Sequence, residues 1–541
     1  MESLFKEKSE IEISKLRKRK KKRPSKAVFK DYNQGQQKLL PVSYEEMIPE
    51  GHMVRVVNNV VETMNIEALI KTYKGGGRNA FNPKMLLKVL VYGYVEKIYT
   101  SRRIAKALRE DINFMWISGG NRPDFRTINN FRSGRLKKVI DEVFSSMVIF
   151  LTENKYIKLE NYFIDGTKIQ ADANRYSYVW ASNTKRYKNR TEEKIKELLK
   201  QIEKTNKEEN KRYGNRDLEE LGEDSGKISS EKISEQVKKL NEIIKKVGDK
   251  PKEEDKKIKK AIAEIETKLL PKLKKYEQQQ QTLQARGSYS KTDKDATFFR
   301  MKSDQILPAY NVIIGSNEQI IINYSIHQKP SEVDRFIPHM RKLQRTTRGK
   351  LPERIIGDSA YGSEENYNFL ENHQIENYLK YGSFYQQQKG INQKKRFHKD
   401  NFTYREEEDK YYCSEGQAME MIEEGESITD NGYLQNFKKY KGVNCLSCGL
   451  LNLCSKSPQG RTIQLNAKLE EYKAEARRNL ISPTGIALRK QRSTDVETIF
   501  GDIKQNQGFR KFNLRGIEKV NTEFGILAMA HNIKKIKTMI S

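Results

Sequence analysis

The sequence predicts an α/β protein that carries a helical N-terminal domain and a helical insertion. Three observations support this fold class. Apolar residues recur with the period of an amphipathic helix from about residue 44 to 150. Short apolar strands then alternate with helices on both sides of a polar segment, which is the pattern of a mixed sheet layered with helices. The polar segment itself, 185–280, spaces its apolar residues like a coiled coil.

The stretch 44–150 is expected to be all helical. An Asn-Pro pair at 82–83 supplies an N-cap and a favoured first helical residue. Ser101 can cap a short helix, the glycine-containing loop 118–123 follows, and another helix starts near Phe125. This order resembles a helix-turn-helix, and its Arg and Asn side chains can pair with guanine and adenine edges. The alternative is a helical bundle with a basic face. The candidate DNA-contacting residues here are Arg102, Arg103, Arg126, Asn129, Asn130 and Arg132.

The segment 185–280 is expected to form a helical hairpin or arm. It holds 28 basic and 21 acidic residues, and this near balance favours a solvated structural arm over a DNA-binding surface. Glycines such as Gly214 and Gly248 interrupt the pattern, which argues against one continuous rod. The predicted apolar seam consists of Ile195, Leu198, Leu199, Ile202, Ile233, Val237, Leu240, Ile244, Val247, Ile258, Ile262, Ile265, Leu269 and Leu273.

Strands are predicted on both sides of this arm. Residues 161–166 form a strand before it, so the arm is an insertion after the first strand of the sheet. A helix with Phe336, Met340 and Leu343 on one face should cover the sheet. The expected elements after the arm are a hairpin of 309–314 and 319–326 turning at 315–317, a helix capped by Ser331, a strand at 354–358, a helix from Ser363 and a strand at 375–379.

The charge of the chain points to a polyanionic partner. The 541 residues include 103 Lys and Arg against 72 Asp and Glu, a net charge of +31, which most often indicates nucleic acid. Residues 1–30 alone hold 12 basic and 4 acidic residues, as in a flexible arm for phosphates or a solubilising tail. The absence of a long apolar run or a signal peptide argues against a membrane or secreted protein, and four cysteines suit a reducing compartment.

Carboxylates stand at the ends of two predicted strands. Asp165 ends the first strand and Asp358 ends the strand 354–358, where ligand sites of α/β folds lie. Glu497 is a third candidate, and Lys504 follows it by two helical turns. Three converging carboxylates would hold two hard divalent cations, which can activate water or a 3′-hydroxyl for in-line attack on a phosphodiester.

Each acid also has a structural interpretation. An Asp-Gly pair at 165–166 is a turn signal, Asp358 can start a loop, and Thr494 with Glu497 fits a capping box. Asp495 and Asp502 are rival carboxylates beside Glu497, although neither has the matching offset to Lys504.

Short motifs in a fixed order resemble bacterial insertion-sequence transposases of the DDE class. The resemblance covers nearly the whole chain. The motifs are Phe29-Lys-Asp-Tyr-Asn-Gln, Leu40-Pro, Ile48-Pro-Glu-Gly-His-Met-Val, Ser101-Arg-Arg-Ile-Ala, Asp165-Gly-Thr-Lys, Asp293-Lys-Asp-Ala, Gly357-Asp-Ser-Ala-Tyr-Gly, Val496-Glu-Thr-Ile-Phe-Gly and Ala530-His-Asn-Ile. Each motif is weakly specific alone, whereas their order and spacing are highly specific.

The resemblance implies a ribonuclease H-like catalytic domain in which Asp165, Asp358 and Glu497 are the metal-binding triad and Lys504 is the basic residue after the catalytic Glu. Many relatives carry a Tyr seven residues and an Arg four residues before that Glu. Here those positions are Lys490 and Ser493, and the nearest arginine is Arg492, five residues before the Glu. The sequence therefore departs from the family pattern at both positions.

All four cysteines fall between Asp358 and Glu497. The spacing of the last three is that of a zinc knuckle, and the first is a distant fourth ligand. Relatives carry a similar cysteine-bearing insertion at this place. The hypothesis is a structural zinc site, against free thiols or a vestigial site. The residues are Cys413, Cys445, Cys448 and Cys454.

The sequence thus predicts a cytoplasmic, nucleoid-associated bacterial transposase. It would bind the terminal repeats of its element, cleave DNA and join 3′-ends to target DNA with two Mg²⁺ or Mn²⁺ ions, acting as a homodimer on paired ends. No phosphate-binding loop indicates a nucleotide cofactor. The alternatives are an inactive DNA-binding protein that represses its element, or a host nuclease of the same fold. Further candidate DNA-binding residues are Lys168, Arg492, Arg510, Lys511 and Arg515.

The expected division of the chain follows from these motifs. It comprises a basic tail (1–35), a helical DNA-binding domain (36–150), the first part of the catalytic domain (151–184), the coiled-coil insertion (185–283), the second catalytic part (284–383), the cysteine-bearing insertion (384–481) and C-terminal catalytic helices (482–541).

Overall fold

The computed structural model describes residues 43–73, 80–213, 229–246 and 253–540. The chain divides into two compact units, Met1–Met47 and Ile48–Ser541. The first contributes the short helix α2 (Tyr44–Met47), and the basic tail predicted for 1–35 lies outside the described residues. Within the described ranges, no helix has the length and apolar character needed to cross a bilayer.

The larger unit begins with helices, as predicted. α5 begins at Pro83 because the Asn82 side chain accepts hydrogen bonds from the backbone N–H groups of Lys84 and Met85. Thr100 caps α6 instead of Ser101, which is buried. The helices are α3 (Met53–Thr63), α4 (Glu67–Ile70), α5 (Pro83–Val95), α6 (Ser101–Glu110), α7 (Ile112–Ile117), α8 (Phe125–Asn130) and α9 (Ile140–Glu153).

The connection between α6 and α8 differs from the predicted helix-turn-helix. It contains α7, which Asp111 caps, and then a loop to Asp124, the cap of α8. A helix-turn-helix joins its two helices by a turn of about three or four residues. The sequence likeness to that motif therefore does not extend to the connection, which includes an additional apolar helix.

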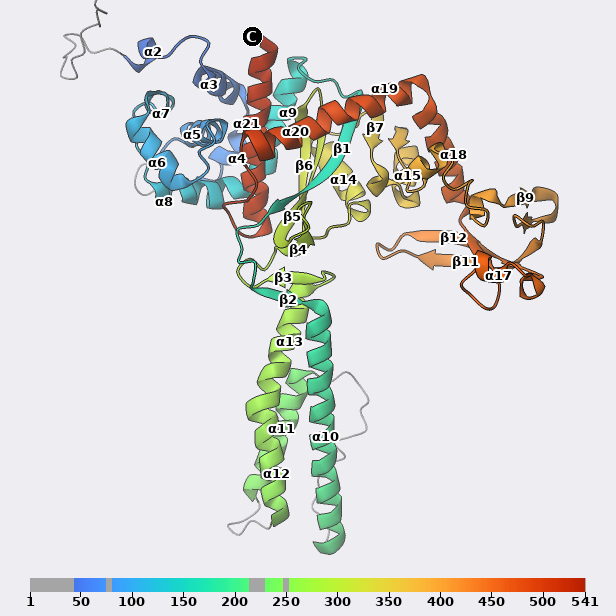
Figure 1. Ribbon diagram of the computed structural model, residues 1–541. Helices are drawn as coiled ribbons and strands as arrows, with labels where there is room; N and C mark the ends of the chain where they lie inside the picture. The colour runs from blue at the N-terminus through green and yellow to red at the C-terminus, as the bar shows by residue number, and fades with distance from the viewer. Residues whose placement is uncertain (1–42, 74–79, 214–228, 247–252, 541) are drawn as a thin grey trace, which may run out of the picture. The chain divides into compact units, whose positions relative to one another are not determined.

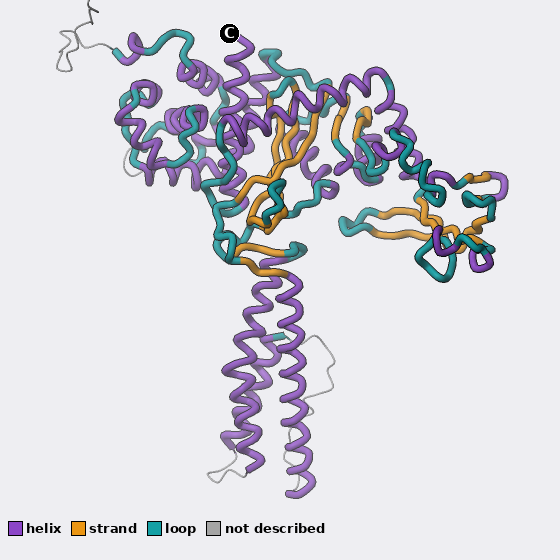
Figure 2. Tube along the Cα trace, viewed as in Figure 1, coloured by secondary structure: helices purple, strands orange, loops and turns teal. Residues whose placement is uncertain are grey.

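The main sheet is mixed and has the strand order β4-β5-β1-β7-β8, with β6 also paired to β5 (Figures 1 and 2). β1 runs antiparallel to β5 and parallel to β7, and β7 runs parallel to β8. The α/β class predicted from the sequence is confirmed. The strands are β1 (Asn161–Gln170), β4 (Thr297–Arg300), β5 (Ile306–Asn317), β6 (Ile320–His327), β7 (Arg354–Gly357) and β8 (Glu376–Leu379).

The predicted hairpin exists, but its turn was misplaced. β5 continues through Gly315, Ser316 and Asn317, and the chain reverses at Glu318 and Gln319, both with positive φ. Gly315 is required for packing within the sheet, because a Cβ there would lie 1.7 Å from the hydroxyl oxygen of Tyr162. The glycine that suggested a turn therefore serves a close approach between β1 and β5.

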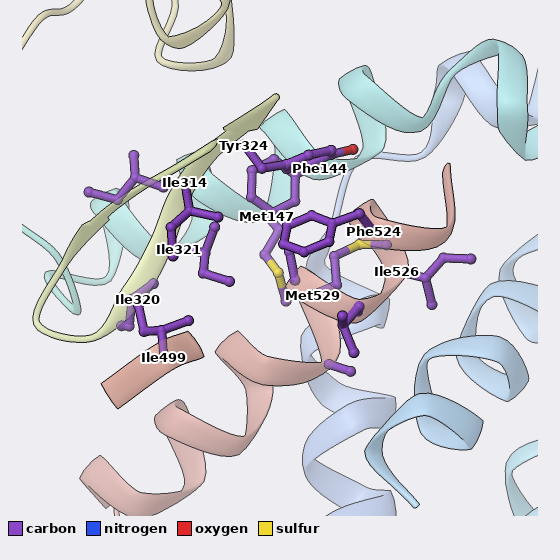
Figure 3. Packing of buried hydrophobic residues seen from close by; sticks show 14 of the residues in the cluster. Phe144, Met147, Ile314, Ile320, Ile321, Tyr324, Ile499, Phe524, Ile526 and Met529 are labelled. Carbon is purple, nitrogen blue, oxygen red and sulfur yellow. The ribbon is translucent and has the colours of Figure 1, made fainter. Parts of the chain in front are cut away.

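Helices from both ends of the unit cover the sheet and share its core (Figure 3). The ring of Tyr324 on β6 packs against Phe144 of α9, with ring centroids 5.0 Å apart, and against Phe524 of α21 at 5.3 Å. Phe336, Met340 and Leu343 are buried on α14, as predicted, although that helix begins only at Phe336. The covering helices are α14 (Phe336–Thr346), α15 (Glu364–Asn372), α20 (Thr498–Gly501) and α21 (Ile517–Ile540).

The insertion after β1 is helical. β2 (Tyr178–Trp180) and β3 (Ser288–Ser290) pair where it begins and ends, and α10 runs beside α13 (Figure 1). The predicted seam residues Ile195, Val237 and Ile262 are buried in one apolar cluster with most of the others, whereas Val247 lies outside the described residues. The helices are α10 (Ala181–Tyr213), α11 (Ser230–Lys246), α12 (Glu253–Glu264), the π-helix η3 (Ile265–Leu269) and α13 (Leu270–Leu283).

The cysteine-bearing segment forms a separate antiparallel sheet that the sequence reading did not predict. Its strand order is β13-β12-β11-β10-β9, and its small core is made of Phe402, Met419, Tyr440 and Ile463. The strands are β9 (Thr403–Arg405), β10 (Lys410–Tyr412), β11 (Ala418–Ile428), β12 (Leu434–Gly442) and β13 (Thr462–Leu465).

The chain ends in consecutive helices that return to the main sheet. α18 (Ala467–Ile481) leads to α19 (Pro483–Arg492), the π-helix η9 (Ser493–Glu497), α20, the π-helix η10 (Asp502–Asn506) and α21. The Asp293-Lys-Asp-Ala motif fixes the start of α21, because Asp293 accepts a hydrogen bond from Gly516 N and Asp295 from Ile517 N. This motif therefore has a structural role as a helix cap supplied from a distant segment.

Candidate active site

One arginine contacts all three predicted carboxylates. Nη2 of Arg492 lies 3.1 Å from Oδ1 of Asp165 and 4.0 Å from Oδ2 of Asp358. Its Nη1 lies 4.0 Å from Oε1 of Glu497. Because a guanidinium is a small planar group, the three carboxylates must face one small volume. Residues that are distant in the sequence therefore form one anionic cluster around a buried cation.

Asp165 and Asp358 meet because β1 and β7 are parallel neighbours. Phe163 pairs with Ile356, and continuing this register by two residues places Asp165 level with Asp358. β1 does not turn at Asp165 and Gly166 but continues to Gln170. Asp358 does begin the loop after β7, where its Oδ1 accepts a hydrogen bond of 2.9 Å from Ala360 N. This bond holds the carboxylate at the end of the strand.

Glu497 is placed by a π-helix. Arg492 ends α19 and Glu497 ends η9, so they are separated by one π-helical turn. A π-helix closes i→i+5 hydrogen bonds, which brings residues five apart onto the same face. The offset of Arg492 from the position that relatives use, four residues before the Glu, is thereby compensated. The capping-box alternative is wrong, because the helix is continuous through Glu497 and Thr494 Oγ1 donates to Gln491 O.

The Lys504 side chain lies close to Asp165 on β1. Its Nζ donates a hydrogen bond to the hydroxyl of Thr167, which lies two residues after Asp165 and thus on the same face of the strand. Burial, together with the charge of Lys302, lowers the pKa of Lys504 to about 8, against the opposing effect of Asp165. The amine is therefore partly neutral slightly above physiological pH.

The two rival carboxylates face other parts of the protein. Asp495 is buried and accepts hydrogen bonds from the Ser316 hydroxyl and from Gln319 N at the β5–β6 turn. Asp502 bonds to His531 and Gln507, and these bonds lower the pKa of Asp502 below its ordinary value. Both acids are thus engaged in packing the helices against the sheet.

Burial and the charge of Arg492 act in opposite directions on the pKa of Asp165. Burial raises the pKa of Asp165, Arg492 lowers it, and the charges of Asp358 and Glu497 raise it again. In the described part of the chain, no group of three His, Cys, Asp or Glu side chains is already arranged to hold a metal ion. At the carboxylates, the Arg492 guanidinium lies among the oxygen atoms. These hard oxygen donors, which already surround one positive charge, fit a divalent cation such as Mg²⁺.

Two segments of the chain match known protein families. Residues 412–537 match the family described as Transposase DDE domain, and residues 42–134 match the family described as Transposase domain (DUF772). Together, the two matches indicate a DDE transposase of an insertion sequence. No curated protein and no solved structure matches the chain. The first match contains Glu497 and Lys504, whereas Asp165 and Asp358 lie outside both matched segments.

The candidate DNA-contacting residues of the N-terminal helices share one hollow. Its volume is about 500 Å³, and the Phe125 ring lies at its surface with the guanidinium carbons of Arg102 and Arg126 at 5.1 and 5.7 Å from the ring centroid. Arg103 is exposed on the same helix. The predicted residues that line the hollow are Arg102, Arg126, Asn129, Asn130 and Arg132, and Asn513 joins them from the segment before α21.

Arg132 differs from the others because the protein itself uses its guanidinium. The residue is 3% exposed, and its nitrogens donate to the Tyr94 hydroxyl, to Tyr99 O and to the Ser101 hydroxyl. It therefore ties the segment after α8 to α5 and α6. Both Arg132 and Arg492, predicted to contact DNA, hold protein groups in this structure.

The other predicted DNA-binding residues lie on β1 and on the segment after η10. Lys511 and Arg515 are exposed and both pair with Asp172, which follows β1. Arg510 is exposed and bonds to Lys504 O, and Lys168 Nζ donates to Arg300 O. These contacts orient the cations along the segment between η10 and α21 without burying them.

The four cysteines gather in the segments that connect the strands of the small sheet. All are half-buried and free, and they line a cavity of about 30 Å³. Burial raises the pKa of the Cys454 thiol, Arg461 lowers it, and the other three thiols raise it. The backbone N–H of Arg461 donates to Cys445 Sγ at 3.4 Å. The thiols are thus close enough to influence one another.

Two residues near the carboxylates were not predicted from the sequence. The carboxylate of Glu332 lies against Gly166. Burial lowers the pKa of Lys380, and the charged neighbours of Lys380 include Arg492 and Asp358. Glu332 precedes α14 in a polar loop and Lys380 follows β8, so neither carries a motif. The one available signal was Gly166 inside a strand, which indicates that another group approaches the backbone closely.

Proposed function

We propose that this transposase binds the ends of its element and catalyses metal-dependent DNA cleavage and strand transfer at Asp165, Asp358 and Glu497. The observation that carries the proposal is the contact of one guanidinium with all three carboxylates. Carboxylates do not converge in a strongly basic protein without reason, since their mutual repulsion costs stability unless a cation offsets it.

The order of the strands supports a ribonuclease H-like catalytic fold. β6, β5 and β1 are successive antiparallel neighbours, and β7 and β8 extend the sheet in parallel on the other side of β1. The first strand is therefore central, and β5 and β7 lie on its two sides. Asp165 occupies this central place, which fits a carboxylate shared between two cations.

The residues of the site divide the work. Asp165, Asp358 and Glu497 would hold two Mg²⁺ or Mn²⁺ ions, which when bound activate water or a 3′-hydroxyl and stabilise the leaving oxygen. Arg492 balances the carboxylates and keeps them facing inward. Lys504, fixed by Thr167, presents a positive charge to a phosphate next to the scissile bond.

The DNA path follows the exposed cations. Arg102, Arg103, Arg126, Asn129 and Asn130 would contact the terminal repeat. Asn513 links their hollow to the segment of Arg510, Lys511 and Arg515, which leads to the carboxylates. Base edges would be contacted in the hollow, and backbone phosphates along that segment and at Lys168.

The cysteines are proposed to hold one structural zinc ion. Cys413, Cys445, Cys448 and Cys454 line one small cavity in a sheet with a very small apolar core. Four thiolates close a zinc site and stabilise such modules. Zinc measured per mole of purified protein tests this, and far less than one equivalent would contradict it.

The test of the proposed function uses labelled duplex DNA from the element ends and Mg²⁺ or Mn²⁺. The wild-type protein should cleave at the end and join the 3′-hydroxyl to target DNA, whereas Asp165→Asn should bind but not cleave. Asp304→Asn is the matched control. The Asp304 side chain is 82% exposed in a turn, and its ion pair is with Arg300 at the protein surface. Binding without cleavage by wild type would instead indicate a repressor, and cleavage without joining a nuclease.

A further inference from the structure

A fourth carboxylate lies against the strand that carries Asp165. Glu332 precedes the short helix η4 (Val333–Arg335) between β6 and α14. A Cβ on Gly166 would lie 2.2 Å from Oε1 of Glu332, 2.5 Å from its Cδ and 2.8 Å from Oε2. The carboxyl group is therefore seated on the backbone of the residue next to Asp165, in a space that exists only because residue 166 is glycine.

The surroundings of Glu332 are those of the carboxylate cluster. Burial raises the pKa of Glu332, the neighbouring Tyr361 hydroxyl lowers it, and the charges of Asp165 and Asp358 raise it further. Asp358 and Glu497 are also among the charges that raise the pKa of Asp165. Asp165 is thus within electrostatic range of Glu332, Asp358 and Glu497.

The buried hydroxyl of Tyr361 indicates that a polar ligand is accommodated beside this carboxylate. Tyr361 is 0% exposed, and its hydroxyl interacts with the Glu332 carboxylate, although no hydrogen bond of ordinary geometry satisfies that hydroxyl among the described residues. The side-chain oxygen of Asn311 nearby is likewise without a partner. Buried polar atoms are nearly always satisfied by protein or by ordered water. Two such atoms beside an acid cluster suit a hydrated ion.

We propose that Glu332 is a fourth acidic ligand of the active site and, with Asp165 and Asp358, holds one of its two divalent cations. Tyr361 and Asn311 orient its carboxylate or a water bound to the ion. The proposal rests on the proposed function, and it assigns to Gly166 the role of admitting Glu332 to the site. Without Glu332, the cation bound by Asp165 and Asp358 would lose an oxygen ligand.

The test is Mn²⁺ binding to the full-length protein without DNA, measured from free Mn²⁺ by electron paramagnetic resonance. Wild type should bind two ions. Glu332→Gln, which keeps the shape but removes the charge, should weaken one of them by about tenfold or more. Asp334→Asn is the matched control, because it removes a carboxylate from the same segment that instead pairs with Arg335.

A second comparison separates ligand loss from misfolding. Gly166→Ala should weaken the same ion, because the added Cβ displaces the Glu332 carboxyl group. Adding Gly166→Ala to Glu332→Ala should cause little further loss, since there is then no carboxylate to displace. Two ions bound by Glu332→Gln with wild-type affinity would overturn the inference while leaving the proposed function intact. A wild type that binds no Mn²⁺ and cleaves no DNA would overturn both.

Discussion

The carboxylate cluster and the cysteine cluster gather candidate metal ligands in opposite ways. The carboxylates come from β1, the loop after β7 and a π-helix, and a buried arginine lies among them. The cysteines lie in segments that connect the strands of one small sheet, and all four line a cavity of about 30 Å³. The first arrangement depends on a large, rigid core, whereas the second sits where apolar packing is thin. We infer that a metal would serve chemistry at the first and stability at the second.

The largest expected effect is a difference in DNA cleavage between variants of the carboxylate cluster and of the cysteine cluster. Glu497→Gln removes a ligand of the cation that would offset negative charge in the transition state. The expected loss is about 4 kcal/mol, or about a thousandfold in the rate of DNA cleavage. Cys448→Ser should leave the cleavage rate of folded protein within a few-fold of wild type. Single-turnover cleavage of end DNA measures both. Similar losses in the two variants would break the distinction.

The next largest expected effect is a difference in stability between variants of the two clusters. Cys448→Ser should release the proposed zinc and expose residues 403–465 to protease about tenfold faster, since opening of that sheet would cost about 1.4 kcal/mol less. Glu497→Gln should leave proteolysis of this segment unchanged. Limited proteolysis followed by mass spectrometry measures the rates. Unchanged proteolysis of Cys448→Ser would contradict a stabilising metal.

A smaller, pH-dependent effect belongs to Lys504. Burial lowers its pKa to about 8, so the positive charge is present below that pH and is lost as the pH rises through it. Binding of end DNA should therefore weaken between pH 7 and pH 9 by up to about tenfold, the value of a charge-assisted hydrogen bond. Lys504→Arg keeps its charge and should lose this pH dependence in fluorescence anisotropy. An identical profile in Lys504→Arg would exclude Lys504 as its source.

The smallest effect concerns stability at the carboxylates. The pKa of Asp165 is raised in the folded protein, so its ionisation destabilises the fold, fully so above the folded pKa and not at all below the unfolded one. Asp165→Asn should therefore melt at a higher temperature than wild type at pH 7 without divalent ions. This gain should vanish as the pH falls below the ordinary range of an aspartate. Calorimetry of both proteins at pH 7 and at the lower pH measures this difference. A lower melting temperature for Asp165→Asn at pH 7 would contradict a destabilising charge on Asp165.

The sequence was sufficient for what is local. Asn82 with Pro83 marked the start of α5, Ser363 marked α15, and the periodic seam marked the helical insertion. Asp165 and Asp358 could be proposed because two predicted strands bring acids to the same edge of a sheet, although β1 in fact continues past Asp165 to Gln170. These features depend on residues close together in the chain or on a general rule of sheet topology.

What the sequence could not supply depends on distant contacts. Gly315 resembled a turn but makes room for Tyr162, and Gly166 resembled a turn but adjoins Glu332. Arg132 and Arg492 looked like DNA contacts, yet hydrogen bonds and ion pairs within the protein hold both. The π-helix that brings Arg492 under Glu497 has no sequence signature, because it inserts one residue into an otherwise regular helix.

The central claim is that a divalent cation is held among Asp165, Asp358 and Glu497. The most direct test is to load zinc-replete protein with Fe²⁺ and generate hydroxyl radicals, which cut the backbone within a few ångströms of the ion. We expect cuts near residues 165, 358 and 497 together, all lost in Asp165→Asn and suppressed by excess Mg²⁺. Cuts confined to residues 413–454, or cuts that persist in Asp165→Asn, would contradict the account.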